Sequence, residues 1–527
     1  MTKMHTDKLI VSNFDKLKQK YGSAGAKQVH TAVTKLIKAD AARGIGSRLV
    51  DLSDAATMAK CGIKPLLAKD ATNDKRNKQA IDAIYKHGEI RPAYLMLLGS
   101  KDVIPYVSLA NPAAGDGDAD LPSDLPYATD KPYSQDVQDF IAPTRVVGRL
   151  PNVTNDTNPA YLIRLLQTAT TYKAQPVQDY LPYLGISAEV WTKSTELSLD
   201  AIFGSHAKMK ISPPDGPKWT AAEAKPLAHF INCHGAAGDP NYYGQKGASY
   251  PVAHEASWMA SKVVPGTVLA AECCYGAELY DPAVLTAAGQ MPMCNTYLGN
   301  KAFAFFGSTN IAYGPTAAND QADLMCQYFA INLGSGASCG RACLQARLNY
   351  VLAKGSVLTP TDLKTLGQFT LIADPSLTPV ALPPREVLAT QKAKPSEASA
   401  AVARHSRSNR RAGLFSRAEA VRTYRLREYA PASSGKGTAL GKLRQLAAQH
   451  GIKPDVIISY AIGAPSQSAR AKGFTALAEV SGPGPKAVHT VLERVEPPKE
   501  IPHLVLVRGV EGIEYTDGID ARLFESR

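Results

Sequence analysis

Three common features are missing from this sequence, and each absence excludes a class of protein. Residues 1–21 are polar and charged, with no apolar core of a secretion signal, and no later run approaches the roughly 20 apolar residues of a membrane helix. The eight cysteines show neither paired metal-ligand spacing nor the framework of a small disulfide-bonded domain. No nucleic-acid-binding motif is present. These absences predict a cytoplasmic protein with reduced thiols, no bound metal and no membrane contact.

What is present is typical of globular domains. The chain has 527 residues, 45% hydrophobic and 20% charged, which is enough for about two to four domains. The net charge of +12 raises the alternative of a polyanion-binding protein with nucleic acid as its partner. Because no motif accompanies the charge, a solvated basic surface and a basic linker are the favoured interpretation, and nucleic acid is not a predicted partner.

Strand-like and helical patterns alternate through the first 380 residues. This alternation predicts an α/β fold of mostly parallel sheets flanked by helices, in two halves, 1–180 and 181–380. The expected strands are 8–11, 48–52, 93–98, 181–191 and 301–309, and the expected helices are 14–21, 26–37, 77–87, 154–172, 320–332 and 340–353.

The composition changes after residue 380. Residues 381–412 are rich in Pro, Ala, Ser and Arg, and predict a basic flexible linker. Residues 413–527 predict a small C-terminal α+β accessory domain, which is a candidate site for a regulatory partner. Its expected elements are a helix at 440–450 and strands at 455–461, 474–480 and 503–507.

Two similar units between residues 227 and 276 organise the rest of the chain. Residues 227–235 are an apolar run that ends in His234-Gly235, and residues 267–276 are a second run that ends in Glu-Cys-Cys-Tyr-Gly. Runs of this length fit buried parallel strands, whose carboxyl ends meet at one edge of a sheet. His234 and either Cys273 or Cys274 should therefore lie together. A thiol beside an imidazole is the minimal set for nucleophilic acyl transfer.

At these residues the sequence resembles the caspase-like clan of cysteine peptidases, which includes caspases, legumains, metacaspases and gingipains. Laying the caspase pattern Gln-Ala-Cys-Arg-Gly on residues 272–276 places the nucleophile at Cys274. Over about residues 8–380 the resemblance is strongest to gingipains. The further matching segments are Leu97-Leu-Gly99, Ser123-Asp124-Leu-Pro-Tyr127, the strand ending in Gly148-Arg149, and Ala373-Asp374-Pro375-Ser376, where alanine replaces the family's glycine.

The resemblance implies a role for several backbone and side-chain groups. Cys274 is the expected nucleophile and His234 the general acid/base, while the backbone N–H groups of Gly235 and Cys274 are the expected oxyanion donors. Gingipains have an acidic third member at the position of Thr144 here, so Asp124 and Asp139 are the nearby alternatives. A Cys–His dyad is the simpler interpretation.

Other residues compete for these roles or complete the predicted site. Cys273 is the alternative nucleophile, although strand alternation directs it toward the core together with Cys233. His229 and His254 are the alternative bases, but neither precedes a glycine.

Two acidic residues are expected to define the substrate preference. Glu272 stands where legumains and metacaspases have an acidic pocket residue, and Asp239 is a second candidate wall. Together they predict cleavage of a protein or peptide substrate after Arg or Lys.

The prediction is a cysteine endopeptidase, activated by processing or by a partner. The Arg-rich segment 404–411 would be accessible to such an enzyme, so self-processing is one route, although a solvated tether is the favoured interpretation. Calcium steadies loops in some relatives, but no calcium site is predicted here. The alternatives are a catalytically silent caspase-like scaffold and the polyanion-binding protein.

Overall fold

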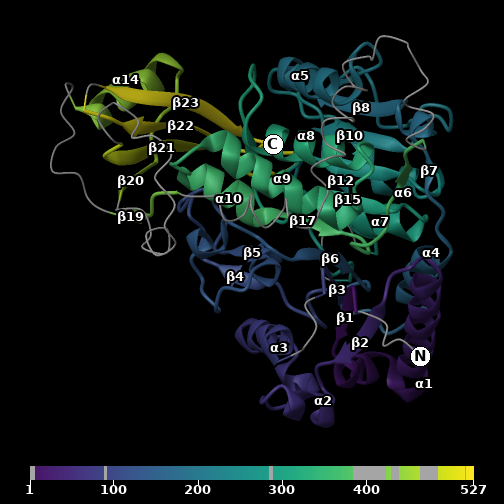
Figure 1. Cartoon of the computed structure of the whole chain (residues 1–527). Coiled ribbons are helices and arrows are strands. Elements are labelled where there is room, and N and C mark those ends of the chain that lie inside the picture. Colours follow the sequence, from purple (N-terminus) through teal and green to yellow (C-terminus); the bar gives the residue numbers. More distant parts are fainter. Residues whose placement is uncertain are drawn as a thin grey trace.

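A single ten-stranded sheet forms the centre of the protein (Figure 1). The computed structural model describes residues 6–87, 92–283, 289–383, 423–428, 438–462, 485–516 and 518–527. In spatial order the strands are β2 (Ser47–Asp51), β1 (Lys8–Ser12), β3 (Tyr94–Leu98), β6 (Val146–Leu150), β17 (Phe369–Ile372), β15 (Ala304–Ser308), β14 (Val268–Ala271), β10 (Ala228–Asn232), β8 (Tyr183–Ala188) and β9 (Lys210–Ser212). All neighbours are parallel except β15 and β17, so the predicted α/β class is confirmed.

The two predicted halves share this sheet rather than forming separate ones. Residues before 180 supply β2, β1, β3 and β6, and later residues supply the other strands. The joining strand is β17, which runs parallel to β6 and antiparallel to β15. β1, β6, β8 and β15 are buried along their whole length and are mostly apolar in the sequence, although β1 includes Lys8 and β6 includes Arg149.

Helices pack against the sheet in two contacting groups, one containing α1 and α4 and the other α5, α8, α9 and α10. The helices of this part are α1 (Phe14–Ala42), α2 (Ala55–Lys60), α3 (Asp74–His87), α4 (Ala160–Thr171), α5 (Thr192–Phe203), α6 (Ala256–Met259), α7 (Met293–Gly299), α8 (Gln321–Gly334), α9 (Cys339–Lys354) and α10 (Pro360–Gln368). The helices expected at 14–21 and 26–37 are one element with a kink at Gly22, whose φ of 68° favours glycine.

Short strands and 3-10 turns complete this part. The strands are β4 (Val107–Leu109), β5 (Leu121–Ser123), β7 (Gln175–Pro176), β11 (His234–Gly235), β12 (Asn241–Tyr243), β13 (Val252–Glu255) and β18 (Val380–Ala381). The turns are η1 (Ala68–Asp70), η2 (Leu125–Ala128), η3 (Val137–Phe140), η4 (Val177–Tyr180) and η5 (Glu189–Trp191). Through β11, β12 and β13 the segment after β10 folds into a small antiparallel sheet.

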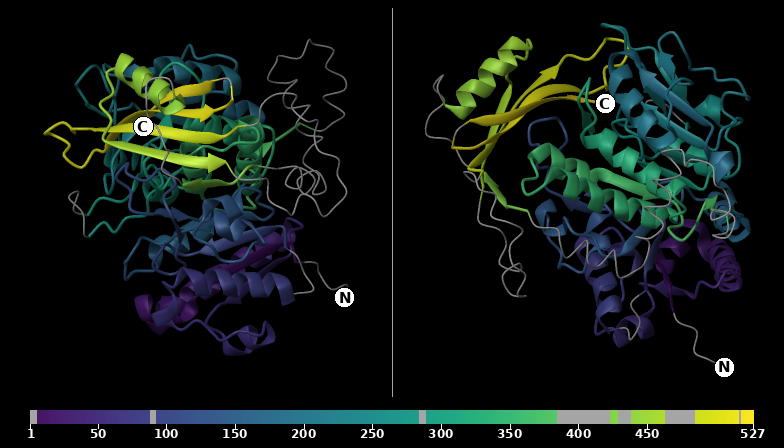
Figure 2. Two further views of the ribbon diagram at one scale, coloured as in Figure 1. Left: turned by 90° about the vertical axis from the view of Figure 1, so that its left-hand side faces the viewer. Right: turned by 45° about the horizontal axis from the view of Figure 1, so that its top comes forward.

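The C-terminal region forms a twisted antiparallel sheet with one helix on it, as expected for an α+β domain (Figure 2). Its order is β16 (Tyr313–Gly314), β23 (Ile519–Ser526), β22 (Leu506–Glu514), β21 (Ala487–Val495), β20 (Val456–Ile462) and β19 (Leu426–Glu428). The helix α14 (Ala439–Gln449) buries Leu440, Leu443 and Ala447 against Val491 and Val510. Since β16 belongs to the preceding α/β part, this sheet is continuous with it.

Several predictions lie outside the described residues or are not tested by the fold. The strand expected at 474–480 and the Arg-rich segment 404–411 fall outside them, as does nearly all of the predicted linker. Among the helices that the structure describes, none is long and apolar enough to cross a membrane. The cytoplasmic location stays a prediction.

Candidate active site

The parallel strands β10 and β14 are direct neighbours, and their ends bring His234-Gly235 beside Cys274. The approach is so close that a Cβ atom added to Gly235 would lie 1.9 Å from the carbonyl oxygen of Cys274. Only glycine fits there, because any side chain would collide with backbone. The two units predicted to meet at one sheet edge therefore do so.

The adjacent thiols Cys273 and Cys274 have different surroundings. The Sγ of Cys273 lies 3.8 Å from the carbonyl oxygen of Ile231 in the core. The Sγ of Cys274 accepts a hydrogen bond from the backbone N–H of Ala312 at 3.2 Å, in the loop that leads to β16. Cys274 is therefore the thiol that lies beside the segment described below.

His234 is held by a hydrogen bond and by the aromatic rings of Trp191 and Tyr250. Its Nε2 lies 2.7 Å from Oε1 of Gln245, whose amide nitrogen donates to Gly247 and Tyr250. Its ring centroid lies 4.3 Å from that of Trp191. Because Oε1 can only accept, Nε2 carries the proton and Nδ1 has the free lone pair. Nδ1 is buried and has no hydrogen-bond partner among the described residues, so it is available for proton transfer.

The competing histidines are core residues. Nδ1 of His229 and Nε2 of His254 both lie 2.9 Å from the hydroxyl of Tyr297, and Nδ1 of His254 also accepts from Trp219. Their hydrogen-bonding groups are thus used within the fold, whereas Nδ1 of His234 has no partner among the described residues.

An extended segment of the chain itself fills the groove beside these residues. β23 pairs with β16 in antiparallel register, with Ser526 opposite Tyr313. The next residue, Arg527, donates its backbone N–H to Ala312 at 2.9 Å. Its carbonyl oxygen accepts from the N–H of Cys274 at 3.0 Å and that of Gly235 at 3.4 Å. The two amides predicted as oxyanion donors thus bind the same oxygen.

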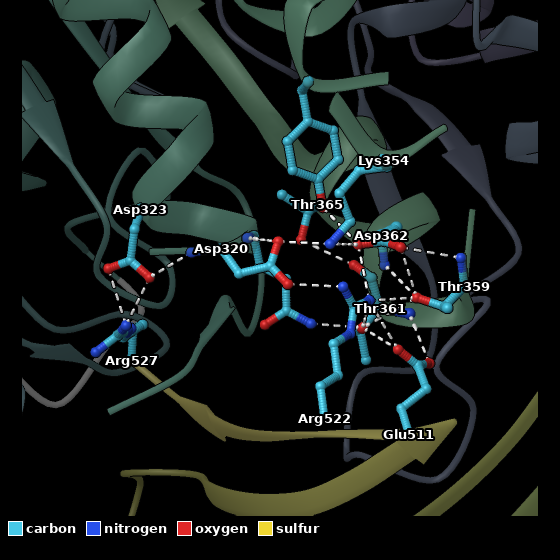
Figure 3. A network of polar contacts seen from close by, with 12 residues as sticks. Asp320, Asp323, Lys354, Thr359, Thr361, Asp362, Thr365, Glu511, Arg522 and Arg527 are labelled. Atoms are coloured by element: carbon cyan, nitrogen blue, oxygen red, sulfur yellow. Dashed lines mark hydrogen bonds and ion pairs between the residues drawn. The ribbon is translucent and has the colours of Figure 1, made fainter. Parts of the chain in front are cut away.

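The side chain of Arg527 is fully buried in a pocket formed by Asp323, Pro315 and Trp191. Figure 3 shows its guanidinium facing the carboxylate of Asp323. Its Nη2 lies 2.9 Å from both carboxylate oxygens of Asp323 and donates to the carbonyl of Pro315. Its guanidinium carbon lies 4.5 Å from the ring centroid of Trp191. A carboxylate and an aromatic face are the two partners that a guanidinium prefers.

Glu272 lies in the same buried region but is not the hydrogen-bond partner of Arg527. Both of its carboxyl oxygens lack a donor in the described part of the chain. Burial raises the pKa of Glu272 well above its usual range, and the neighbouring charge of Asp323 raises it further. Burial also raises the pKa of Asp323, but Asp323 is the carboxylate that contacts the guanidinium of Arg527, so we assign the ion pair of the pocket to Asp323.

Two predicted site residues are not in the pocket or beside the histidine. Asp239 lies 2.6 Å from Nε2 of His503 and accepts from the hydroxyl of Tyr243, so it is not a wall of the arginine pocket. Thr144 donates its backbone N–H to Ala128 and is not placed as a partner of His234. Both assignments rested on distance along the sequence from a matched motif, which does not determine where a loop residue points.

Asp124 was the other candidate third member, and it belongs to a buried ion pair. Its carboxylate accepts from Nε and Nη2 of Arg149 at 2.9 and 2.5 Å. The guanidinium also donates to Gly99 and Ile104. Asp124 and Arg149, two of the positions that resemble gingipains, therefore form a structural ion pair inside the α/β core. The other alternative, Asp139, pairs with Arg425.

We expect Asp124→Ala to lower the free energy of unfolding by about 3–5 kcal/mol, because it leaves the buried guanidinium of Arg149 without a counter-charge. Chemical denaturation followed by circular dichroism measures this change. Asp139→Ala, which breaks a partly exposed pair, is the control and should cost no more than about 1 kcal/mol. An Asp124 variant as stable as the control would contradict the assignment.

Three further residues beside His234 and Arg527 carried no signal in the sequence. Gln245 lies in a loop, Trp191 ends the turn η5, and Asp323 lies in the first turn of α8, far along the chain from β10 and β14. None is part of a motif near His234 or Cys274. Among the described residues, no group of three or more His, Cys, Asp or Glu side chains could hold a metal ion.

Comparisons with known proteins give structural similarities only. No protein-family model and no curated protein matches the chain. A solved structure described as a protease and the Arg-specific cysteine proteinase gingipain R each have a TM-score of 0.47 and 11% identity, covering 100% and 99% of this chain and 98% of each neighbour. The complex of Porphyromonas gingivalis RgpB pro- and mature domains has a TM-score of 0.45 and 11% identity, covering 98% of this chain and 99% of that one.

Proposed function

We propose that this protein is a cysteine endopeptidase that cleaves after arginine. Cys274 is the nucleophile, and His234 is the general acid/base. The observation that carries the proposal is the position of Arg527, whose carbonyl oxygen is bound by two backbone amides beside the Cys274 thiol while its side chain fills the acidic pocket. This is the arrangement required of the residue before a scissile bond.

The reaction follows from the positions of these groups. The Cys274 sulfur attacks the carbonyl carbon, and its proton passes through His234 to the departing amine. The developing oxyanion is bound by the N–H groups of Gly235 and Cys274, as the Arg527 oxygen is here. Water then adds to the thioester, a proton returns to the thiol, and the new carboxylate leaves. Gln245 acts as a positioning residue that fixes the imidazole tautomer.

Arginine should be preferred over lysine in this pocket. A planar guanidinium can bind Asp323 and the carbonyl of Pro315 together while stacking on Trp191, as Arg527 does. A lysine ammonium is a point charge that loses the stacking contact. The predicted basic preference thus rests on Asp323 rather than on Glu272 and Asp239.

An irreversible peptide probe tests this function even if the site opens rarely. We expect an acyloxymethyl ketone that carries arginine before the reactive carbon to form a thioether with Cys274 during prolonged incubation, as located by peptide mass mapping. The matching lysine probe should label more slowly and a norleucine probe should not label. Cys274→Ala should remove the adduct and Cys273→Ala should keep it. A folded protein that is never labelled at Cys274 would be a scaffold rather than a peptidase.

A further inference from the structure

We propose that residues 519–527 are an intramolecular ligand of the active site and hold the enzyme latent until β23 leaves β16. The proposal rests on the proposed function and concerns its regulation. The C-terminal domain would act as a built-in inhibitor, and activation would be the displacement of one strand. Any partner or processing step that separates β23 from β16 would then be an activator.

The first support is that the segment uses the same atoms that a substrate would need. Arg527 occupies both amides of the oxyanion site, the carboxylate of Asp323 and the carbonyl of Ala312. The residues before it pair with Tyr313 and Gly314 of β16. A second peptide with arginine before the cut cannot make these contacts while β23 is in place. Residues 519–527 therefore compete directly with a substrate for the same site.

The second support is the firm attachment of the segment to its own domain. β23 pairs with β22 from Ile519 to Glu525, opposite Glu514 to Arg508. The hydroxyl of Ser526 accepts from the N–H of Val507 at 2.8 Å, and Phe524 packs edge-on against Tyr313 with ring centroids 5.1 Å apart. The segment is thus an integral strand of a folded domain, which lowers the entropy cost of placing it in the groove.

The third support is a second arginine that fastens β23 to the α/β part (Figure 3). Nη1 of Arg522 lies 2.7 Å from Asp320, and its Nη2 lies 2.8 Å from Asp362 and 3.0 Å from Glu511. Asp320 and Asp362 belong to the capping boxes of α8 and α10, so these carboxylates are already fixed. This latch, Arg522 with Asp320, Asp362 and Glu511, joins β22 and β23 to two helices.

Arg522 of β23 and Arg527, which directly follows the strand, therefore both bind the start of the same helix. Asp320 caps α8 and binds Arg522, and Asp323 in the first turn binds Arg527. Charge complementarity at two points fixes the register of the strand, so that Arg527 and no neighbouring residue enters the pocket. The two ion pairs therefore favour one specific arrangement, with Arg527 in the pocket, over a nonspecific contact between the domains.

With Arg527 in the site, the side chains of Cys274 and His234 are shielded from water and uncharged. The exposed fractions are 1% for Cys274 and 2% for His234. Burial raises the pKa of the Cys274 thiol to about 12. Burial also lowers the pKa of His234 to about 4, and the charge of Arg527 lowers it further. With β23 in place, the site has neither a thiolate nor access for water.

Arg527→Ala should raise kcat/KM for an arginyl fluorogenic tetrapeptide by at least about tenfold. The apparent affinity for substrate is the intrinsic affinity multiplied by the fraction of enzyme molecules whose site is open, and the substitution increases that fraction. Arg522→Ala, which breaks the latch outside the pocket, should also activate. Arg508→Ala is the matched control, since Arg508 on β22 pairs with Glu493 on β21 and its loss should leave the rate unchanged. Adding a peptide of residues 519–527 should inhibit the Arg527→Ala enzyme, and the same peptide ending in alanine should not.

Covalent labelling separates this proposal from the proposed function. Faster probe labelling of Cys274 in Arg527→Ala and Arg522→Ala than in the wild type would support latency. Equal labelling rates in folded wild-type and variant proteins would overturn latency and leave the peptidase intact. No labelling of Cys274 in any folded protein would overturn the peptidase itself. Circular dichroism and the unfolding midpoint establish that each variant is folded. If Arg527→Ala does not fold, the comparison of Arg522→Ala with the wild type decides between these outcomes.

Discussion

Cys274→Ala is expected to lower kcat/KM for arginyl peptides by a factor of about 10⁴ or more, since no other group in the site can form the acyl intermediate. The comparison is best made within the Arg527→Ala protein, so that occupation of the groove does not mask the loss. The methyl side chain keeps the packing beside Ala312, and the unfolding midpoint should change little. Fluorogenic hydrolysis at several enzyme concentrations measures the residual rate.

The adjacent cysteine provides the matched control for this prediction. Cys273 lies one residue away, is equally buried and faces the carbonyl of Ile231 rather than the groove. Cys273→Ala should therefore leave kcat/KM within about threefold, although it removes the same sulfur atom from the core. If Cys273→Ala abolished turnover and Cys274→Ala retained it, the nucleophile would be assigned to the wrong thiol.

Asp323→Asn should lower kcat/KM for arginyl substrates by about 10²–10³-fold, because truncating the charge of a buried ion pair costs about 2–5 kcal/mol. The asparagine keeps the size of the side chain but offers a guanidinium one neutral acceptor in place of two charged oxygens. The loss should be smaller for a norleucine peptide, which makes no ion pair. A panel that varies only the residue before the cut measures this difference.

Glu272→Gln tests the other acid of the pocket in the same assay. Glu272 makes no hydrogen bond with Arg527, and burial raises its pKa, which favours the uncharged acid. Glutamine has the same size, so arginyl turnover should stay within about tenfold. The opposite result, a large loss in Glu272→Gln and little change in Asp323→Asn, would return the charge of the pocket to Glu272. Lysyl substrates should follow the arginyl ones in direction.

The sequence predicted the parts of the site that depend on local pattern. Apolar runs that stop at His234-Gly235 and at Cys274 predict two neighbouring strand ends, and strand alternation separates Cys274 from Cys273. These features follow from a few consecutive residues and the geometry of a parallel sheet. The same reasoning predicted the α/β class and the C-terminal α+β domain.

The remaining contacts depend on how distant segments close on one another. Asp323 reaches the pocket because α8 packs against β14 and β15, which no periodicity near residue 323 indicates. Arg149 ends a strand that the sequence matches to the family, but the sequence does not show that its guanidinium is buried with Asp124. A buried ion pair and a catalytic carboxylate require the same residue types, so the pattern alone could not distinguish them.

Displacement of β23 from the short strand β16 would create an edge at which two molecules of the protein can pair. In the described structure β16 is the terminal strand of its sheet, and its backbone pairs on one side with β23, with Tyr313 opposite Ser526 and Gly314 opposite Glu525. When β23 departs, these paired sides of β16 and β23 become open sheet edges of the kind that pair with strands of other molecules. Activated enzyme without substrate should therefore form oligomers at high concentration, and a peptide bound along β16 should keep it monomeric.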